Sequence, residues 1–444
     1  MGGGSVEIIS LGCPKNLVDA ERIAARLKAK GYKIVNCQGE TILINTCSFI
    51  TTARREARLV IRSALGRKRR GEAQKVVLAG CMVESHRQEL QAQFNQIDGY
   101  ISLTEIDHSA EIVAGEKNND SQLTFRTISG PRELLTKPHL AYLKISEGCD
   151  NRCSYCRIPG IRGNYRSREL ADVVTEAEGL AQTGVKELAL VGEDTSRYGD
   201  DLSPRSSLAE LLSRLNRIEG LRFIRLLYLS PYNISSDLLS AIANLAKVLP
   251  YMDIPLQYTG NNILADMHRQ PLPAPIDRLV AGWRKAIPGL TLRTTLMVGF
   301  PTETEKDFNM MLNQVKSGLF DYAGVFSYSP EESTPAHSLT PLPERIVQKR
   351  QELLLQAQER VTFGRYRRMI GETIEVIVDD AHIDPPPYSL PSGTTLGRAS
   401  FQAPQIDGVT WLSRKKGRFL EDGEIISARI TSFRGFDLLA EVSP

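Results

Sequence analysis

Six of the seven cysteines fall into two sets of three, and the spacing of one set is typical of iron–sulfur chemistry. Cys149, Cys153 and Cys156 follow a C-x₃-C-x₂-C spacing, which gives a cluster three thiolate ligands and leaves a fourth iron without a protein ligand. An open iron can bind a small molecule, so this loop predicts a site for chemistry and not only for electron storage. Zinc is the alternative, but a structural zinc site takes four ligands, and no other Cys or His lies close by in the sequence.

The other set consists of Cys13, Cys47 and Cys81, which are spaced 34 residues apart. Each follows directly after a predicted strand, in the turn before a helix. Because the carboxyl ends of parallel strands share one edge of an open sheet, we expect these thiols to converge and to hold a second cluster. Separate burial as core thiols is the alternative. Cys37 has no partner pattern, and we expect it to be a core residue.

Residues 1–130 are predicted to form an open α/β domain with a parallel sheet. Short apolar runs at residues 6–10, 33–35, 41–45 and 75–79 predict strands, and amphipathic stretches at 16–30 and 51–70 predict helices. This alternation favours parallel strands. The polar stretch at residues 114–129 marks the expected boundary with the next domain.

Residues 138–366 are predicted to form a second α/β domain. Its six predicted strands lie at residues 141–146, 186–191, 222–229, 252–255, 291–298 and 322–329. A full barrel of this kind has eight strand–helix units, so the count predicts an open, partial (βα)₆ barrel. The loop that begins at Cys149 follows the first strand, on the face where such barrels place their chemistry. A connecting helix is predicted at residues 346–368.

Residues 367–444 are predicted to form a small β-barrel of the kind that binds oligonucleotides or proteins, with strands at 373–378, 409–412 and 425–433. From residue 370 onward there are 11 acidic and 7 basic residues, a net charge of −4, which leaves about +7 on the rest of the chain. Affinity for nucleic acid comes mainly from Lys and Arg that neutralise phosphates. The acidic barrel therefore suits a basic protein partner better than a nucleic acid.

Several weaker patterns have two interpretations each. Gly192 and Glu193, after the second strand of the central domain, either bind an amino-acid-like ligand or form a turn. The same two interpretations, a ligand contact or a turn, apply to Val298 and Gly299 after the fifth strand. The basic run at residues 67–70 is either a solvated helix end, which the helix dipole favours, or an RNA contact. Four arginines after the cysteine loop either line a substrate entrance or solvate the loop: Arg157, Arg162, Arg166 and Arg168.

The bulk composition excludes several classes of protein. With 41% hydrophobic and 24% charged residues in 444, the chain is typical of globular proteins of about three domains. The first residues lack the basic and apolar regions of a secretory signal, and no apolar run approaches the length of a membrane span. Thiols at metal-ligand spacings fit a reducing compartment, so we expect a cytoplasmic location and no membrane partner.

These cysteines and segments resemble the methylthiotransferases, a branch of the radical S-adenosylmethionine (SAM) enzymes, over essentially the whole chain. The matching segments are LGCPKNLVD (11–19), NTCSF (45–49), KISEGC (144–149), IPGIRG (158–163), DIPLQ (253–257), RTT (293–295), GVFSYS (324–329) and GRASFQAPQIDG (397–408). The CPKN and APQIDG segments are most similar to the RimO branch, which modifies a ribosomal protein. Glu193 and Tyr258 stand where that branch often has Gln and His.

The resemblance implies an N-terminal methylthiotransferase domain, a central radical SAM domain and a C-terminal TRAM-like barrel. It implies that Cys149, Cys153 and Cys156 hold a 4Fe-4S cluster whose open iron binds SAM. A second 4Fe-4S cluster would be held by the other set, which consists of Cys13, Cys47 and Cys81. This cluster would carry the sulfur to be donated. SAM would then serve both as radical source and as methyl donor.

The resemblance also implies contacts with SAM. Tyr155 would lie against the adenine, Gly192 and Glu193 would meet the methionine end, and Val298 and Gly299 would line the adenosine side. No catalytic residue beyond the cluster ligands is assigned.

The implied reaction is methylthiolation of the β-carbon of an aspartate in ribosomal protein S-twelve, met free or on the small subunit. It needs a reducing electron donor and a sulfur source, and a contact with ribosomal RNA is possible. One alternative is methylthiolation of a modified adenosine in tRNA, against which the acidic barrel argues. An alternative of another class is a non-catalytic, metal-stabilised protein that binds the ribosome or RNA.

Overall fold

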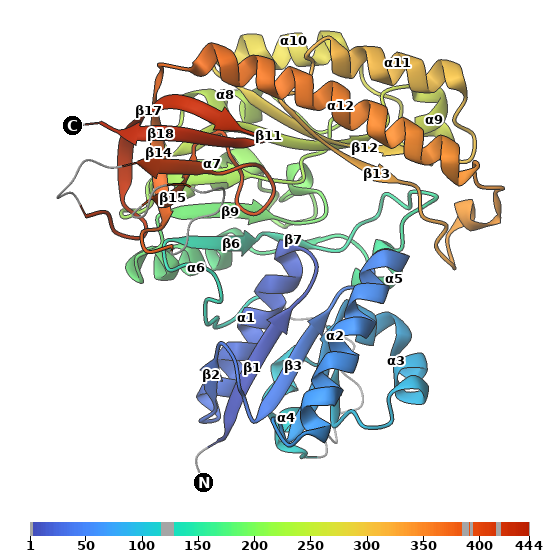
Figure 1. Ribbon diagram of the computed structural model, residues 1–444, viewed down its shortest axis with the longest axis vertical. Helices are drawn as coiled ribbons and strands as arrows, with labels where there is room; N and C mark the ends of the chain where they lie inside the picture. Colours follow the sequence, from blue (N-terminus) through green and yellow to red (C-terminus); the bar gives the residue numbers. More distant parts are fainter. Residues whose placement is uncertain (1–2, 117–127, 384–389, 391–393, 414–418, 444) are drawn as a thin grey trace.

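The computed structural model describes residues 3–116, 128–383, 390, 394–413 and 419–443. Figure 1 shows an N-terminal lobe at one end of the molecule, a central sheet flanked by helices at the other, and a small barrel packed beside the central sheet. Most of the polar stretch predicted as the first domain boundary, residues 117–127, lies outside the described residues. The predicted domain limits themselves stay predictions.

The N-terminal lobe contains a five-stranded parallel sheet in the order β2-β1-β3-β4-β5. Side chains of β3 alternate between its two faces: Leu43 packs toward α1 and α4, whereas Ile42 and Ile44 pack toward α2 and α3. This confirms the predicted open parallel-sheet fold. The bounds are β1 (Ser5–Ser10), α1 (Pro14–Ala29), β2 (Lys33–Val35), β3 (Thr41–Thr46), α2 (Thr51–Arg69), β4 (Lys75–Gly80), α3 (Cys81–Gln93), β5 (Gly99–Ile101), η1 (Ile106–His108) and α4 (Ser109–Ala114).

The central sheet has six parallel strands in the order β13-β12-β11-β10-β9-β6. Neighbours in the sheet are neighbours in the sequence, which confirms the open (βα)₆ arrangement. Its strands are β6 (Leu140–Lys144), β9 (Glu187–Val191), β10 (Phe223–Leu226), β11 (Val248–Gln257), β12 (Thr291–Val298) and β13 (Tyr322–Ser327). Its helices are α6 (Leu170–Gln182), α7 (Leu208–Leu215), α8 (Ser236–Asn244), α9 (Asn261–Asp266), α10 (Ile276–Ala286) and α11 (Glu305–Lys316).

The two faces of the central sheet are covered differently. Leu143, Leu188 and Ile224 point into the large core that the sheet shares with its helices. Side chains on the opposite face, such as Tyr142, pack instead against Ile377 and Ala403 of the C-terminal barrel and Val18 of α1. The barrel and α1 therefore cover the sheet face that the helices leave open.

The C-terminal strands close into a barrel in the order β14-β15-β16-β18-β17, as predicted. Their bounds are β14 (Thr373–Asp380), β15 (Thr395–Ala399), β16 (Thr410–Ser413), β17 (Ile425–Arg434) and β18 (Asp437–Val442). The long helix α12 (Glu344–Met369) runs along α11 and β13 and leads into the barrel (Figure 1). Short elements near the cysteine loop are β7 (Ser146–Glu147), α5 (Ile158–Arg162) and β8 (Arg166–Ser167).

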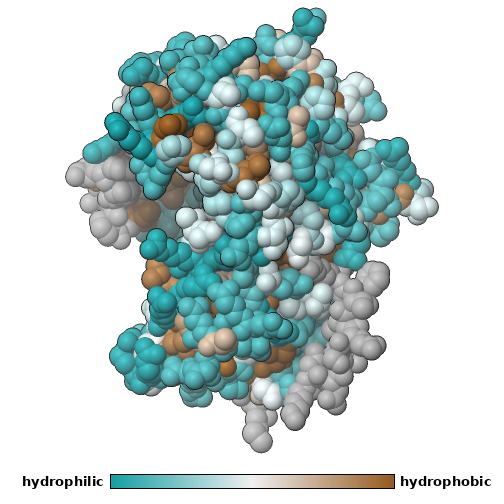
Figure 2. Space-filling model, turned by 90° about the vertical axis from the view of Figure 1, so that its right-hand side faces the viewer, coloured by the Kyte–Doolittle hydropathy of each residue, from teal (hydrophilic) through white to brown (hydrophobic). Residues whose placement is uncertain are grey.

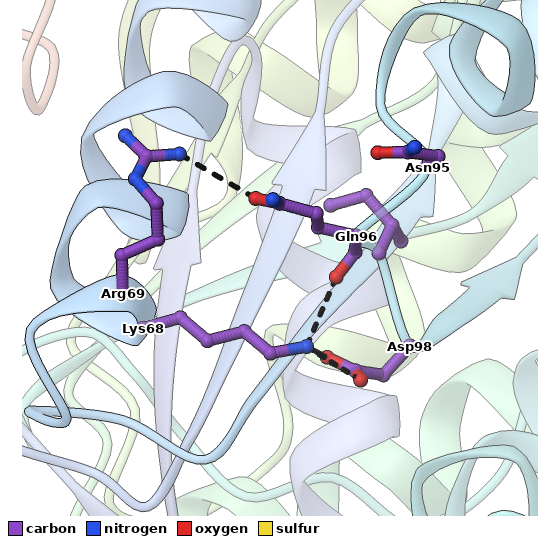
Figure 3. Close-up of a pocket in the computed structure, with 6 residues that line it drawn as sticks. Lys68, Arg69, Asn95, Gln96 and Asp98 are labelled. Atoms are coloured by element: carbon purple, nitrogen blue, oxygen red, sulfur yellow. Dashed lines mark hydrogen bonds and ion pairs between the residues drawn. The ribbon is translucent and has the colours of Figure 1, made fainter.

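Three of the four basic residues at the end of α2 pair with carboxylates of the N-terminal lobe. Lys68 donates to the Asp98 carboxylate at 2.6 Å and to the Gln96 carbonyl at 3.0 Å, beside a shallow pocket (Figure 3). Arg67 is paired with Glu7 at 2.7 Å. Because α2 starts near Cys47 and rises about 1.5 Å per residue, this end lies about 28 Å from the cysteine edge. These contacts favour the helix-end interpretation over an RNA contact.

The prediction that Cys37 is a core residue is wrong, because this cysteine is exposed. It lies in the loop after β2, a three-residue edge strand, where little chain is present to cover it. Among the described residues, no helix combines the length and the apolar character needed to cross a membrane. The face in Figure 2 is mostly hydrophilic, with small apolar patches separated by polar residues.

Candidate active site between the two cysteine sets

The N-terminal cysteines are brought together at one edge of the first sheet. Cys13 precedes α1, Cys47 follows β3 and Cys81 is the first residue of α3, while β1, β3 and β4 are adjacent strands. Gly12 has a φ of +90°, and a Cβ there would lie 2.6 Å from the Cys47 Cβ. Only glycine permits both the backbone turn and this close approach. The sheet therefore places the three thiols as its topology predicts.

The second set lies on the loop between β7 and α5. Gly148 has a φ of +75°, and a Cβ there would lie 2.1 Å from the Asn164 carbonyl oxygen, so glycine is again required just before the first cysteine. Ser154 fixes the middle of the loop, because its backbone N–H donates to the Met267 carbonyl and its hydroxyl to that of Asp266, both at 2.9 Å. The loop is thus held against the end of α9.

Both sets open into the same cavity of about 440 Å³, although they belong to different sheets. The lining includes all six cysteines together with side chains from the central strands and one from the barrel. The polar and charged lining residues are Lys15, Asn151, Tyr155, Arg162, Glu193, Asp194, Tyr228, Ser230, Asp253, Gln257, Arg269, Arg293 and Thr295. Ile406 is the contribution of the barrel. A small molecule in this cavity would lie between the two sets.

The thiols fit a metal cluster chemically. Burial raises the pKa of both Cys81 and Cys156 to about 12, and it also raises the pKa of Cys47 and Cys149. Such thiols stay neutral unless a metal displaces their protons and supplies positive charge. In the described part of the chain, no three His, Cys, Asp or Glu side chains converge closely enough to hold one metal ion.

A buried network of charges joins the two sets. The Arg162 guanidinium donates to Glu147 at 2.6 Å, to Asp19 at 3.0 Å and to the Cys81 sulfur at 3.3 Å. Lys144 is paired with the same two carboxylates. The sequence leaves two interpretations for Arg162: it lines a substrate entrance or it solvates a loop. The structure places it in the cavity wall, but its pairing makes it a bridge between the domains.

Only some of the residues that the resemblance implies as SAM contacts line the cavity. Tyr155 and Glu193 line the cavity, and the Gly192 carbonyl accepts from Lys15 at 3.2 Å. Val298 and Gly299 are buried at the end of β12 and are absent from the described lining residues, and the Gly299 N–H donates to Glu303 at 3.1 Å. The role of all five residues in binding SAM stays a prediction.

Three basic residues of the cavity had no signal of their own in the sequence. Lys15 pairs with Glu193 at 3.3 Å, and Arg293 pairs with Asp253 at 2.9 Å and with Asp407 of the barrel at 3.4 Å. Arg269 is the third. Lys15 and Arg293 lie inside motifs that were recognised as segments, so the motif positions could have drawn attention to them. Arg269 follows α9 outside every such segment.

Sequence models of known families match the three parts of the chain. The model described as "Uncharacterized protein family UPF0004" matches residues 5–102, the Radical SAM superfamily matches residues 143–315, and the TRAM domain matches residues 370–442. The matches follow the first sheet, the central sheet up to the end of α11, and the barrel.

Full-length relatives decide the family. The chain is 41% identical to the ribosomal protein uS12 methylthiotransferase RimO of Trichlorobacter lovleyi, over 98% of both chains. It is 39% identical to that of Geobacter sulfurreducens over 98% of both chains, and 37% identical to that of Aquifex aeolicus over 98% and 96%. The chain belongs to the RimO methylthiotransferase family. It is a radical SAM enzyme, so its cofactors are SAM and 4Fe-4S iron–sulfur clusters.

Solved structures agree with this RimO-family fold. The radical SAM methyltransferase TsrM of Kitasatospora setae superposes with a TM-score of 0.52 at 15% sequence identity, covering 75% of this chain and 77% of that one. At this identity the likeness concerns the fold alone.

Proposed function

We propose that this chain methylthiolates the β-carbon of an aspartate in ribosomal protein uS12 (S-twelve). The observation that carries the proposal is that both cysteine sets open into one cavity. A reaction that removes a hydrogen atom and then adds sulfur to the same carbon needs both functions within reach of one substrate atom. The names of the full-length relatives support uS12 as the substrate.

The assignment of the cluster ligands is part of this proposal. Cys149, Cys153 and Cys156 would hold the cluster that binds SAM, and the set of Cys13, Cys47 and Cys81 would hold the second. With both clusters in place, the cofactors supply a 5′-deoxyadenosyl radical, a sulfur atom and a methyl group.

The chain's own residues would position the reactants and enclose the cavity. The paired charges of Lys15 and Glu193, and of Arg293 and Asp253, lie in the wall of the cavity and provide polar groups in fixed positions beside the reactants. Ile406 closes the side that faces the barrel. The barrel therefore contributes to the reaction cavity as well as to any docking of the substrate.

The overall change replaces one C–H bond by a C–S–CH₃ group. One SAM would be cleaved to methionine and 5′-deoxyadenosine, which carries the hydrogen away, and the methyl group would come from a second SAM, which becomes S-adenosylhomocysteine. Cleavage of the first SAM needs an electron from a reductant, and the sulfur must come from a donor. The chain must therefore interact with both a reductant and a sulfur donor. A ribosomal-protein substrate places this chemistry in the cytoplasm, where a contact with ribosomal RNA could accompany docking on the small subunit.

Two exposed phenylalanines mark where the substrate loop would enter. Phe49, after β3, is 40% exposed, and Phe326, on β13, is 52% exposed, yet both line the cavity. Exposed aromatic side chains at a cavity mouth are typical of binding surfaces. We expect them to hold apolar parts of the loop that carries the aspartate.

Replacing Phe326 by serine tests whether the mouth of the cavity binds the substrate. We expect the KM for uS12 to rise about tenfold, because roughly 1.5 kcal/mol or more of apolar burial is lost on binding. The stability should change by no more than about 0.5 kcal/mol, because the ring is exposed in the free protein. Leu59→Ser is the matched control, since Leu59 is 59% exposed on α2 outside the cavity, and its KM should not change. An unchanged KM for Phe326→Ser would remove Phe326 from the substrate surface.

Mass spectrometry tests the proposed function directly. The reconstituted protein is incubated with SAM, a reductant and a sulfide source, and with either uS12 or tRNA. We expect a mass gain of one methylthio group on an aspartate of uS12 and none on tRNA. A mass gain on tRNA alone would identify tRNA as the substrate. A mass gain on neither substrate would favour a non-catalytic role.

A further inference from the structure

A carboxylate from the central domain caps the helix that follows Cys47. Helix α2 begins at Thr51, and its N-cap residue, Ile50, makes no side-chain hydrogen bond to the free N–H groups of the first turn. Glu331, in the loop after β13, supplies the missing acceptor. Its Oε1 accepts from the Thr51 backbone N–H at 2.7 Å and from the Thr51 hydroxyl at 3.1 Å. The start of α2 therefore depends on a side chain from the other lobe.

The second oxygen of Glu331 binds the same segment through Arg54. Oε2 accepts from Arg54 Nη1 at 2.6 Å, and the same nitrogen donates to the Ser48 carbonyl at 3.2 Å. Because Ser48 follows Cys47 directly, this pair holds the backbone next to that thiol. Burial tends to raise the pKa of Glu331, but hydrogen bonds from Ser329 and Arg54 overcome it, and the net pKa is lowered. Glu331 is therefore charged at neutral pH.

Glu331 also lies beside the cysteine loop of the central domain. The Arg157 guanidinium is 4.0 Å from the same Oε2, and Arg157 follows Cys156 directly. One buried carboxylate thus lies between the segments that follow one cysteine of each set. The Arg162 network joins the two sets through α1 and α3, whereas Glu331 joins them through the start of α2.

We propose that Glu331 is a positioning residue that fixes Cys47 relative to the loop of Cys149, Cys153 and Cys156. This inference deepens the proposed function and rests on it. In that function, the carbon that loses a hydrogen must receive sulfur from the other side of the cavity. A displacement of about 1 Å between reacting groups can cost about a hundredfold in rate. Loss of Glu331 should therefore leave SAM cleavage intact and impair sulfur insertion.

Two other roles would give different results. Glu331 lies five residues after Phe326 and holds the segment that carries Phe49, so its loss could instead widen the mouth of the cavity. That role would raise the KM for uS12 and leave the ratio of 5′-deoxyadenosine to methylthio product unchanged. A purely stabilising role would lower the folded fraction and change neither quantity in the folded protein. The product ratio and the separation of the clusters are therefore the decisive measurements.

The test compares wild-type, E331Q and E331D proteins, reconstituted to equal iron content and reduced. The magnetic interaction between the two reduced clusters, measured by EPR spectroscopy, depends steeply on the distance between them. We expect E331Q to change this interaction and to raise the ratio of 5′-deoxyadenosine to methylthio product about tenfold to a hundredfold, with SAM cleavage within about twofold of the wild type. E331D keeps the charge but shortens the side chain, so an intermediate effect is expected. It also serves if E331Q does not fold.

Glu21→Gln is the matched control. Glu21, on α1, is also buried and pairs with Arg132 of the segment before the central sheet at 2.5 Å, outside the cavity lining. It should lower the thermal stability as E331Q does, but leave the EPR interaction and the product ratio at wild-type values. If E331Q leaves both unchanged, raises only the KM, or changes them no more than Glu21→Gln does, the inference is overturned. The EPR measurement needs no substrate, so a wild type that forms no methylthio product would count against the proposed function and not against this result.

Discussion

Replacing Cys13, Cys47 and Cys81 together by alanine is expected to lower the iron content from about eight to about four atoms per chain and to abolish methylthiolation. The three residues are the proposed ligands of one cluster, and the other three cysteines lie on a separate loop of another sheet. Cleavage of SAM to 5′-deoxyadenosine should therefore persist. Iron and acid-labile sulfide on anaerobically purified protein measure the first effect, and mass spectrometry of uS12 measures the second. Chromatography of 5′-deoxyadenosine measures the SAM cleavage.

Cys37→Ala is the matched control, because this exposed cysteine lies ten residues before Cys47 and outside the cavity lining. Its iron content and activity should equal those of the wild type. Replacing Cys149, Cys153 and Cys156 should remove the other four irons and SAM cleavage with them. About four irons in both the wild type and the Cys13/Cys47/Cys81 variant would mean that the N-terminal set holds no cluster, and the sulfur source of the proposal would be lost. A colourless, zinc-containing protein would favour the non-catalytic alternative.

The arrangement of the strands could be predicted from the sequence because local patterns determine it. Apolar runs separated by helical stretches specify parallel strands, and the carboxyl ends of such strands share an edge. Cys13, Cys47 and Cys81 follow three strands in this way, so their convergence could be inferred without any long-range contact. The strands β5, β15 and β18 are not among those predicted, because Gly or charged residues interrupt the apolar pattern of each.

The pairing of buried charges could not be predicted in this way. Arg162 and Arg269 both follow the cysteine loop in polar stretches of the sequence, yet Arg162 is enclosed by carboxylates and Arg269 has no carboxylate partner among the described residues. Which carboxylate reaches an arginine depends on how the N-terminal lobe and the central sheet pack. The spacing of residues along the sequence does not indicate that contact.

The charge argument for the barrel also changes once its contacts are visible. Asp379 pairs with Arg398, Asp380 with Lys137, and Asp407 with Arg293. These carboxylates hold the barrel to itself and to the central domain, so they are not available to a partner. Because Lys137 and Arg293 lie outside the barrel, their charges offset two of the carboxylates, and the net charge of −4 overstates the negative charge offered to a basic protein. Discrimination against tRNA therefore depends on the cavity as well.

Glu187→Gln is expected to destabilise the docking of the barrel by about 3–5 kcal/mol. Glu187 on β9 is fully buried between Arg225 of β10, at 2.8 Å, and Arg398 of β15, also at 2.8 Å. Glutamine keeps the shape and removes the charge. This leaves Arg398 paired with Asp379 alone and leaves Arg225 with no carboxylate partner among the described residues. Hydrogen exchange should show loss of protection in β14–β18 with little change in the N-terminal sheet. Equal loss in both would mean that Glu187 stabilises the whole chain rather than the docking of the barrel.

The destabilisation should depend on pH in a defined direction. Burial tends to raise the pKa of Glu187, but Arg398 and Arg225 overcome it, and the net pKa is lowered from 4.5. A carboxylate whose pKa is lowered by folding contributes stability that is complete above its unfolded value and is lost as the pH falls through its folded value. The difference between wild type and Glu187→Gln should therefore be full at pH 7 and shrink below about pH 4.5. Glu210→Gln, an exposed pair with Arg214, should show a difference of no more than about 0.5 kcal/mol at any pH. A difference that grew on acidification would contradict the assigned ion pair.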